Sequence, residues 1–282
     1  MSDKKNQSKV VSPEASTAGA KMSAKQRRAL QRQQQQRQQQ LILGIVAVVF
    51  LLAVIAVVVL ATRPPDTSIT TDLTHYKDFE AASLQGTTSD GFPYLGAANA
   101  PVTMEEFASF ACPFCLRFHQ EMANNLLDEF KAGRAKYVII PLIDIDYDTT
   151  PATSAALCAG QQGKFWEFHD ILFDWQGTYG QDMNNATRLS TAAQTLGLDM
   201  NKYNACYNGS AVKDVINKAS SLALQRGVNS TPTLFINSKQ ISPPASPTLG
   251  DWRGIIESGA AQATAAPNSN APATPAATQS SQ

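Results

Sequence analysis

The sequence predicts an α/β domain that carries an inserted helical subdomain and follows a single transmembrane helix. Residues 41–61 form an unbroken apolar run. A strand pattern at residues 102–110 leads directly into Cys-Pro-Phe-Cys and a helical pattern, and strand character returns only after a long helical stretch. With 282 residues, 43% of them hydrophobic and 16% charged, the chain has the composition of one globular domain with appendages, which excludes a fibrous or wholly disordered protein.

The apolar run has the length of a membrane span. Its 21 residues, at ~1.5 Å per residue in a helix, just cross a hydrocarbon core of ~30 Å. A signal peptide has a shorter core of ~7 to 15 residues, followed by a small-residue cleavage site, whereas Thr62, Arg63, Pro64 and Pro65 follow this run. We therefore expect residues 41–61 to lie in a lipid bilayer.

Charge is distributed unevenly along the chain. Residues 1–40 hold nine basic and two acidic residues, a net charge of +7, so residues 41–282 carry −7 of the overall zero. The positive-inside rule then places the N-terminus in the cytoplasm and everything after residue 62 outside a cell membrane that is crossed once. The balance of 23 basic and 23 acidic residues leaves no basic excess for nucleic-acid binding.

The two ends of the chain have the composition of disordered tails. Residues 1–40 include eight glutamines between Gln31 and Gln40 and are expected to be a disordered cytoplasmic tail. A helical extension of the span and a contact with anionic lipids are the alternatives for this segment. Residues 261–282 have no charged or aromatic side chain and are also expected to be disordered.

The folded domain is expected at residues 93–260, after an extracytoplasmic linker at residues 62–92 with a short helix around residues 76–84. Past the strand at 102–110, apolar residues recur every four positions from Phe118 to Phe130 and predict a helix that Gly133 ends. The later elements are a strand at 137–143 interrupted by Pro141, a helical insertion over about 150–226, a strand at 233–236, a turn at 237–239 and a last helix at 252–256.

The Cys112, Pro113, Phe114, Cys115 sequence starts a helix. Exposed N–H groups and the positive end of the helix dipole favour the thiolate of a cysteine there. We expect Cys112 to attack and Cys115 to resolve. The alternatives are a zinc site, for which only His119 lies nearby at helical spacing, and an inert disulfide.

Glu106 and Pro232 are further candidates whose roles the residue pattern leaves open. Glu106 shares a strand face with Val102 and Met104, so it is either a buried acid that relays protons or the end of a solvated face. Pro232, after Thr231, enters a strand, and most X-Pro bonds are trans.

The remaining cysteines, histidines and tryptophans have simpler readings. Cys158 and Cys206 are expected to form a structural disulfide, with a second redox pair as the alternative. His75 and His119 are expected to be structural or solvated. Trp166 and Trp175 belong to an aromatic segment that is expected to pack in the core, with a peptide-binding surface as the alternative.

Taken together, these residues resemble the DsbA-like thiol:disulfide oxidoreductases, a thioredoxin-fold family with a helical insertion. The segments that match, in the same order along residues 93–260, are Tyr94, Leu95 and Gly96; Pro101, Val102 and Thr103; Glu106 and Phe107; Cys112 to Cys115; Gln162 to His169; and Gly227 with Thr231, Pro232 and Thr233. A CxxC followed some 115 residues later by a proline that precedes a strand is a specific combination.

The resemblance implies roles for several residues. Pro232 would be cis and lie against the Cys112 sulfur, and the Thr231 backbone would pair with an extended substrate. Glu106 would be the buried acid of the family, and His169 a packing residue of the helical cap. Phe114 departs from the best-known oxidant of the family, which has histidine there and so offers its thiolate a ring N–H.

The expected function is that of a membrane-anchored, monomeric dithiol oxidase that introduces disulfides into exported proteins. By resemblance, a membrane protein of the DsbB or VKOR kind would reoxidise it, and neither metal nor organic cofactor is expected. The alternatives are a reductase or isomerase and, from another class, a metal-binding module that uses Cys112, Cys115 and His119.

Overall fold

The computed structural model describes residues 23–123, 126–144, 146–242 and 247–265. Its chain divides into two compact units, Met1–Pro64 and Pro65–Gln282.

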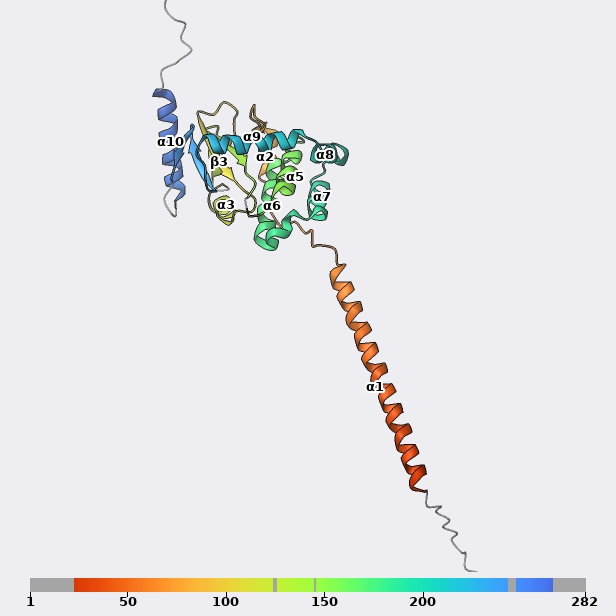
Figure 1. Cartoon of the computed structure of the whole chain (residues 1–282). Helices are drawn as coiled ribbons and strands as arrows, with labels where there is room; N and C mark the ends of the chain where they lie inside the picture. Colours follow the sequence, from red (N-terminus) through yellow and green to blue (C-terminus); the bar gives the residue numbers. More distant parts are fainter. Residues whose placement is uncertain (1–22, 124–125, 145, 243–246, 266–282) are drawn as a thin grey trace, which may run out of the picture. The chain divides into compact units, whose positions relative to one another are not determined.

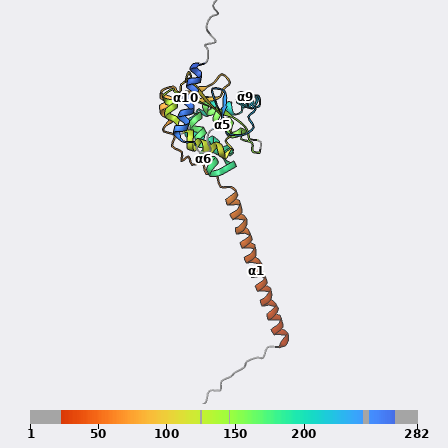
Figure 2. The ribbon, with the colours of Figure 1, turned by 90° about the vertical axis from the view of Figure 1, so that its left-hand side faces the viewer.

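The first unit contains one long helix, α1 (Ala24–Ala61), which runs without interruption (Figure 2). Ser23 caps it, because its hydroxyl accepts a hydrogen bond from the Gln26 N–H at 3.3 Å while the Gln26 side chain accepts one from the Ser23 N–H. By length and composition α1 is able to cross a membrane. The expected disorder of residues 1–40 is wrong for 24–40, because strong helix formers there extend a helix that the apolar run propagates; residues 1–22 lie outside the described residues.

The second unit is built on a mixed sheet in the order β1-β2-β4-β3-β5-β6. Among the strand pairs of the described residues, β3 and β4 alone are parallel, with Met104 opposite Tyr137 and Glu106 opposite Ile139. The strands are β1 (Gln85–Thr87), β2 (Pro93–Leu95), β3 (Val102–Ala108), β4 (Ala135–Pro141), β5 (Thr233–Ile236) and β6 (Lys239–Ile241). Pro141 therefore ends β4 instead of interrupting it, at a position where a missing N–H is tolerated.

The folded part begins before residue 93. Helix α2 (Tyr76–Ala81) and strand β1 lie within the expected linker, and the rings of Tyr76 and Phe79 are buried in the core. The three-residue strand β1 is held by antiparallel pairing with the edge of β2. No local sequence pattern predicts such a pairing.

The described residues after Cys112 contain three helical pieces. These are α3 (Pro113–Phe118), a π-helix η1 (His119–Ala123) and α4 (Leu127–Lys131). Gly133, at φ 69°, follows α4 as expected. The apolar spacing of four predicted a single helix here, and the π-helix replaces its middle turn.

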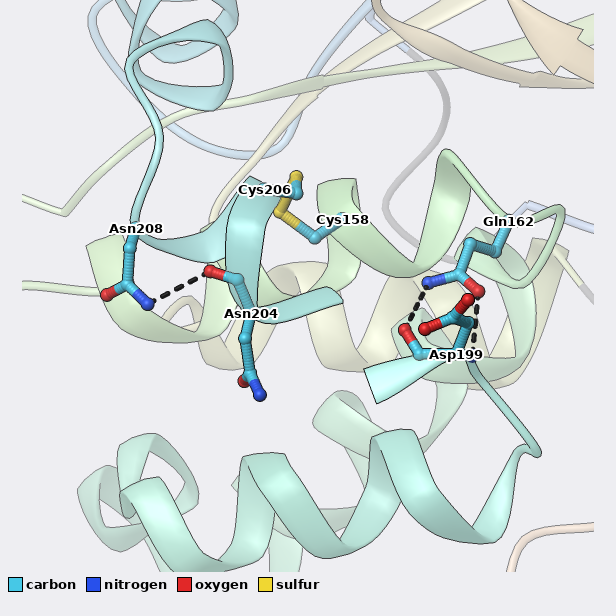
Figure 3. The surroundings of a disulfide bond; sticks show 6 residues. All are labelled: Cys158, Gln162, Asp199, Asn204, Cys206 and Asn208. Carbon is cyan, nitrogen blue, oxygen red and sulfur yellow. Dashed lines mark hydrogen bonds between the residues drawn. A yellow bond between two sulfur atoms is a disulfide. The ribbon is translucent and has the colours of Figure 1, made fainter. Parts of the chain in front are cut away.

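The helical insertion comprises α5 (Thr150–Gly160), α6 (Phe165–Tyr179), the 3-10 helix η3 (Gly180–Asn184), α7 (Ala186–Thr195), α8 (Met200–Tyr207) and α9 (Ala211–Gln225). In the view of Figure 1, α5 to α8 lie to the right of β3 and α10 to its left. Trp166 of α6 contacts Tyr137 of β4, with ring centres 5.4 Å apart. A disulfide between Cys158 and Cys206 joins α5 to α8. The Gln162 side chain and the Asp199 backbone form two hydrogen bonds between the ends of the same two helices (Figure 3).

Helices cover both faces of the sheet. On one face Ala219 and Ala223 of α9 pack against Phe107 and Phe235. On the other, α10 (Leu249–Ala265) approaches so closely that a side chain at Gly259 would lie 2.7 Å from Ile236. The last helix is thus longer than the predicted 252–256, and residues 261–265, expected to be disordered, are helical; residues 266–282 lie outside the described residues.

Candidate functional site

Cys112 is the N-cap residue of α3, four residues after β3 ends at Ala108. Its sulfur accepts a hydrogen bond from the Cys115 N–H at 3.3 Å. Pro113 follows as the first helical residue, where its lack of an N–H costs nothing. The strand and the helix N-terminus therefore place the sulfur where α3 presents its unpaired N–H groups.

The two thiols have opposite acidities. Hydrogen bonding to Cys115 is the largest effect on Cys112, and despite partial burial its pKa falls to about 6. Cys115 is fully buried, and burial raises its pKa well above the ordinary value for a thiol. At neutral pH the first sulfur is a thiolate and the second a thiol.

Glu106 lies beneath this pair on β3, with 2% of its surface exposed. Burial raises the pKa of its carboxyl to about 8, although a hydrogen bond from Tyr137 opposes that shift. The other carboxyl oxygen, Oε1, is buried without a hydrogen-bond partner among the described residues. Of the two readings that the sequence left open for Glu106, the buried one is correct, and the neighbouring Glu105 pairs instead with Arg226 at 2.6 Å on the other face.

Tyr137 is a site residue that the sequence pattern did not single out. Tyr137 of β4 is paired with Met104 of β3 in the parallel register. Glu106 lies two residues further along β3, on the same face of the sheet as Met104. The Tyr137 hydroxyl donates to Glu106 Oε2. Only the pairing of β3 with β4 reveals this contact, although an aromatic hydroxyl in an otherwise apolar strand is a usable signal.

The loop before β5 closes the site from the other side. The Thr231–Pro232 peptide bond is cis, as the family resemblance implied. The Cys112 Sγ atom lies 3.2 Å from the Thr231 carbonyl oxygen, to which the sulfur donates in its protonated form. The same loop therefore meets the sulfur of a residue 119 positions earlier in the chain.

An open cavity of about 460 Å³ adjoins the start of α3. Its lining includes Ala111, Pro113, Leu116, Tyr147 and Met183. Phe114 is 61% exposed beside it, with the Arg117 guanidinium 5.7 Å from its ring centre. The cavity is also lined by Asp144 and Asp146, so apolar and acidic side chains adjoin the start of the redox helix.

The other two cysteines form a disulfide, and Trp166 and Trp175 lie in the core. Cys158 and Cys206 form a disulfide with a Cα–Cα distance of 5.7 Å, so Cys112 and Cys115 are the two free thiols of the chain. Trp166 and Trp175 are almost fully buried, which fits core packing and not an exposed peptide-binding surface.

The histidines do not join the thiols. The Nε2 atom of His119 lies 3.3 Å from an Asp170 carboxylate oxygen, and burial lowers the pKa of this imidazole to about 4. His169 packs among aromatic rings, including Phe110 and Phe173, but it also contacts Asp170. The suggested metal set of Cys112, Cys115 and His119 is therefore not supported, and Asp170 is a polar centre that the sequence analysis missed.

Comparisons with known proteins bear on the same region. The sequence model of the family described as thioredoxin matches residues 88–258. Na(+)/H(+) antiporter NhaA 3 of Salinispora tropica is 30% identical over 149 residues, which cover 53% of this chain and 22% of the antiporter. The chain therefore spans only about a fifth of the length of that relative.

A relative and a solved structure match more of their own length. Disulfide bond formation protein D of Bacillus subtilis is 25% identical over 167 residues, which cover 54% of this chain and 70% of that protein. The crystal structure of oxidised BdbD from Bacillus subtilis superposes with a TM-score of 0.54 and 22% identity, covering 63% of this chain and 98% of the other. At 22% identity, the similarity to the BdbD structure shows a shared fold.

Proposed function

Because the chain belongs to the thioredoxin family, we propose that it is a membrane-anchored thiol:disulfide oxidoreductase that introduces disulfides into exported proteins. The fold class expected from the sequence, a thioredoxin fold with a helical insertion behind one apolar helix, is confirmed, as is the DsbA-like resemblance. We propose in addition that electrons flow from exported substrate proteins to the enzyme and then to a membrane partner.

The observation that carries the proposal is the difference between the two thiols. Cys112 has a pKa of about 6 at a helix N-terminus, and Cys115 is buried with a raised pKa. A cysteine whose thiolate is stabilised leaves easily from a disulfide, so the reduced form is favoured and the enzyme is oxidising.

The exchange proceeds in two balanced steps. A substrate thiolate attacks Cys112 Sγ, the Cys112–Cys115 bond breaks, and the electron pair leaves on Cys115, which takes a proton from the Glu106 carboxyl. A second substrate thiolate then attacks the substrate sulfur of the mixed disulfide, and Cys112 leaves as a thiolate. The substrate has lost two electrons, which an oxidising partner must remove from the enzyme before the next cycle.

The surroundings of Cys112 suit an unfolded protein substrate. We expect the Thr231 backbone, beside the cis Pro232, to pair with an extended chain, as in β-strand addition. Phe114 and the cavity beneath it would accept apolar side chains of that chain. Such contacts select for exposed hydrophobic segments and not for one sequence.

We expect helix α1 to anchor this chemistry at a membrane. With α1 in the bilayer and the basic segment in the cytoplasm, the thioredoxin domain would lie outside, where disulfides persist. A membrane oxidase of the DsbB or VKOR kind would be within reach of Cys112 there. We expect the enzyme to act as a monomer.

The reduction potential of the Cys112–Cys115 pair tests the direction. The pKa of Cys112 lies between the values of about 7 for thioredoxin and about 3.5 for DsbA, so the full chain in detergent should equilibrate with glutathione buffers at a potential between about −270 and about −120 mV. A potential at or below about −270 mV would make the protein a reductase. Mass analysis should follow Cys158 and Cys206 separately.

Single cysteine variants test the roles of the two thiols. Cys112→Ser should abolish oxidation of a reduced, unfolded substrate, since no mixed disulfide forms. Cys115→Ser should accumulate a mixed disulfide on Cys112, visible on a non-reducing gel. If Cys115→Ser traps nothing while Cys112→Ser does, the attacking and resolving roles are reversed.

A further inference from the structure

All three histidines of the sequence meet at one carboxylate. Nε2 of His75 lies 3.6 Å from Asp170 Oδ2, and Nε2 of His119 and Nδ1 of His169 lie 3.3 and 3.0 Å from Asp170 Oδ1. The four residues come from the N-terminus of α2, from the π-helix η1 and from the middle of α6. They take no part in the thiol exchange proposed above.

The spacing is that of ligands around a metal ion. Bonds of ~2.0 to 2.1 Å in a tetrahedral site put neighbouring ligand atoms roughly 3.3 Å apart, and the three nitrogen-to-oxygen distances bracket this value. One ligand atom each from His119, His169 and Asp170 lies within 4.8 Å of the others, and all three residues are buried.

Hydrogen bonds within the described residues do not account for every nitrogen that faces Asp170. His75 Nε2, 3.6 Å from Asp170 Oδ2, is buried and has no hydrogen-bond partner among them. The unpaired His119 Nδ1 and His169 Nε2 are the other ring atoms, since His119 Nε2 and His169 Nδ1 are the nitrogens that contact Asp170. Asp170 is 2% exposed, and its firm donor is the Tyr76 hydroxyl at 2.9 and 2.8 Å. A cation held between these residues would supply the partner that the buried His75 Nε2 lacks and would offset the cost of burying the Asp170 carboxylate.

A route from solvent leads to the cluster. A cavity of about 460 Å³ is lined by His75, His119 and Asp170 and also by Asp72 and Asp174. The additional carboxylates give the cavity a negative charge that attracts cations. Imidazole nitrogens select zinc-like transition metals over calcium and magnesium, which prefer oxygen ligands.

We propose that His75, His119, His169 and Asp170 bind one divalent transition-metal ion of the zinc class. The ion would join α2 and α6 to the turn that directly follows the redox helix α3. Tyr76 would orient Asp170 as a supporting hydrogen-bond donor. The ion has no part in the electron transfer, so this proposal stands or fails independently of the direction of thiol exchange.

Zinc binding to the full chain tests the site. The protein should be purified in detergent without a histidine tag and kept oxidised, so that a disulfide removes Cys112 and Cys115 as ligands. Calorimetric titration with Zn²⁺ should give one ion per chain, and Co²⁺ should give the visible absorption of a tetrahedral site. No stoichiometric binding, or equal binding of Ca²⁺, would overturn the proposal.

Variants show whether the histidines hold the ion. Asp170→Asn, His119→Gln and His75→Gln should each weaken Zn²⁺ binding by at least about tenfold, since even supporting residues of metal sites contribute that much. His75→Gln is the safest variant for folding, because a quarter of that side chain is exposed. Unchanged binding in His75→Gln and His119→Gln would refute the assignment.

The matched control keeps the cavity and removes an acid outside the cluster. Asp72→Asn should leave the Zn²⁺ affinity within about twofold of the wild type, because attraction at the cavity mouth is a screened, long-range effect. If Asp72→Asn weakens binding as much as Asp170→Asn does, the ion is held by surface acids and the proposed site is wrong. Zn²⁺ should also raise the melting temperature of the wild type where Mg²⁺ does not.

Discussion

At the scale of single residues, the site depends on how differently two thiols three positions apart are solvated. Cys112 receives N–H groups from the helix it starts, whereas Cys115 points into the core. The first environment favours negative charge and the second opposes it. The difference between the two thiols is therefore a property of their places in α3 and not of the residue type.

The acidity of Cys112 is directly measurable. Ultraviolet absorbance of the thiolate in the reduced protein should titrate with a midpoint near pH 6. Cys115→Ala should raise that midpoint, because the contact with Cys115 is the largest cause of the shift. Since the folded pKa of about 6 lies below the ordinary thiol value of 9.0, the reduced protein should lose stability as the pH falls from about 9 to about 6. A wild-type midpoint above about 8 would contradict the proposed stabilisation.

Glu106→Gln tests the buried acid. In the folded protein its pKa of about 8 exceeds the ordinary 4.5, so the cost of the buried charge is absent below pH 4.5 and complete above pH 8. The variant should therefore be more stable than the wild type above pH 8, by on the order of 5 kcal/mol in the free energy of unfolding. Chemical denaturation at several pH values measures this.

The same variant should slow substrate oxidation, because Cys115 loses its proton donor. General acid catalysis contributes about 100-fold or more, and a stopped-flow assay should detect a loss of that order. Glu105→Gln is the matched control, since this neighbour lies on the opposite face of β3 and pairs with Arg226. If both variants have equal rates, Glu106 does not relay the proton.

At the scale of elements, the insertion is held together by local pairs of helices. The disulfide joins α5 and α8, and Gln162 accepts from the Asp199 N–H at 2.9 Å and donates to its carbonyl at 3.2 Å (Figure 3). The Asp199 side chain also caps α8. These contacts lie within the insertion and none involves the redox pair.

Removal of the disulfide should therefore affect stability alone. The Cys158→Ala and Cys206→Ala double variant should lose about 4 kcal/mol in the free energy of unfolding, as expected for a crosslink that closes 48 residues. The reduction potential of Cys112 and Cys115 should stay unchanged. A potential shifted by more than about 30 mV would mean that the insertion and the active site are coupled.

At the scale of the whole molecule, charge and hydropathy point to a fixed orientation in the membrane. Helix α1 carries its basic residues on the N-terminal side of the apolar run. Because translocating such charges is unfavourable, the thioredoxin domain should face away from the cytoplasm.

Replacing Arg27, Arg28, Arg32 and Arg37 by glutamate should impair this orientation, and replacing them by lysine should preserve it. An epitope at the C-terminus reports the result, through its accessibility to antibody in cells with an intact cytoplasmic membrane. The wild type and the lysine variant should be accessible, and the glutamate variant much less so. Equal accessibility of all three would show that these charges do not set the topology.

The sequence was informative wherever physical causes act locally. A continuous apolar run specifies a membrane-length helix, and a cysteine followed by proline at a helix start specifies an activated thiol. Alternation along β3 placed Glu106 on the face of Val102 and Met104. The order of strand, redox motif, helical insertion and final strand followed from periodicity and matched the structure.

Only the tertiary structure decided which distant residues meet. Tyr137 reaches Glu106 through the register of β3 with β4, and the Thr231 carbonyl reaches the Cys112 sulfur across the chain. His75, His119 and His169 looked unrelated in sequence, yet they surround Asp170. Such contacts arise from the packing of elements that are far apart in the chain, and periodicity within one element carries no information about its neighbours.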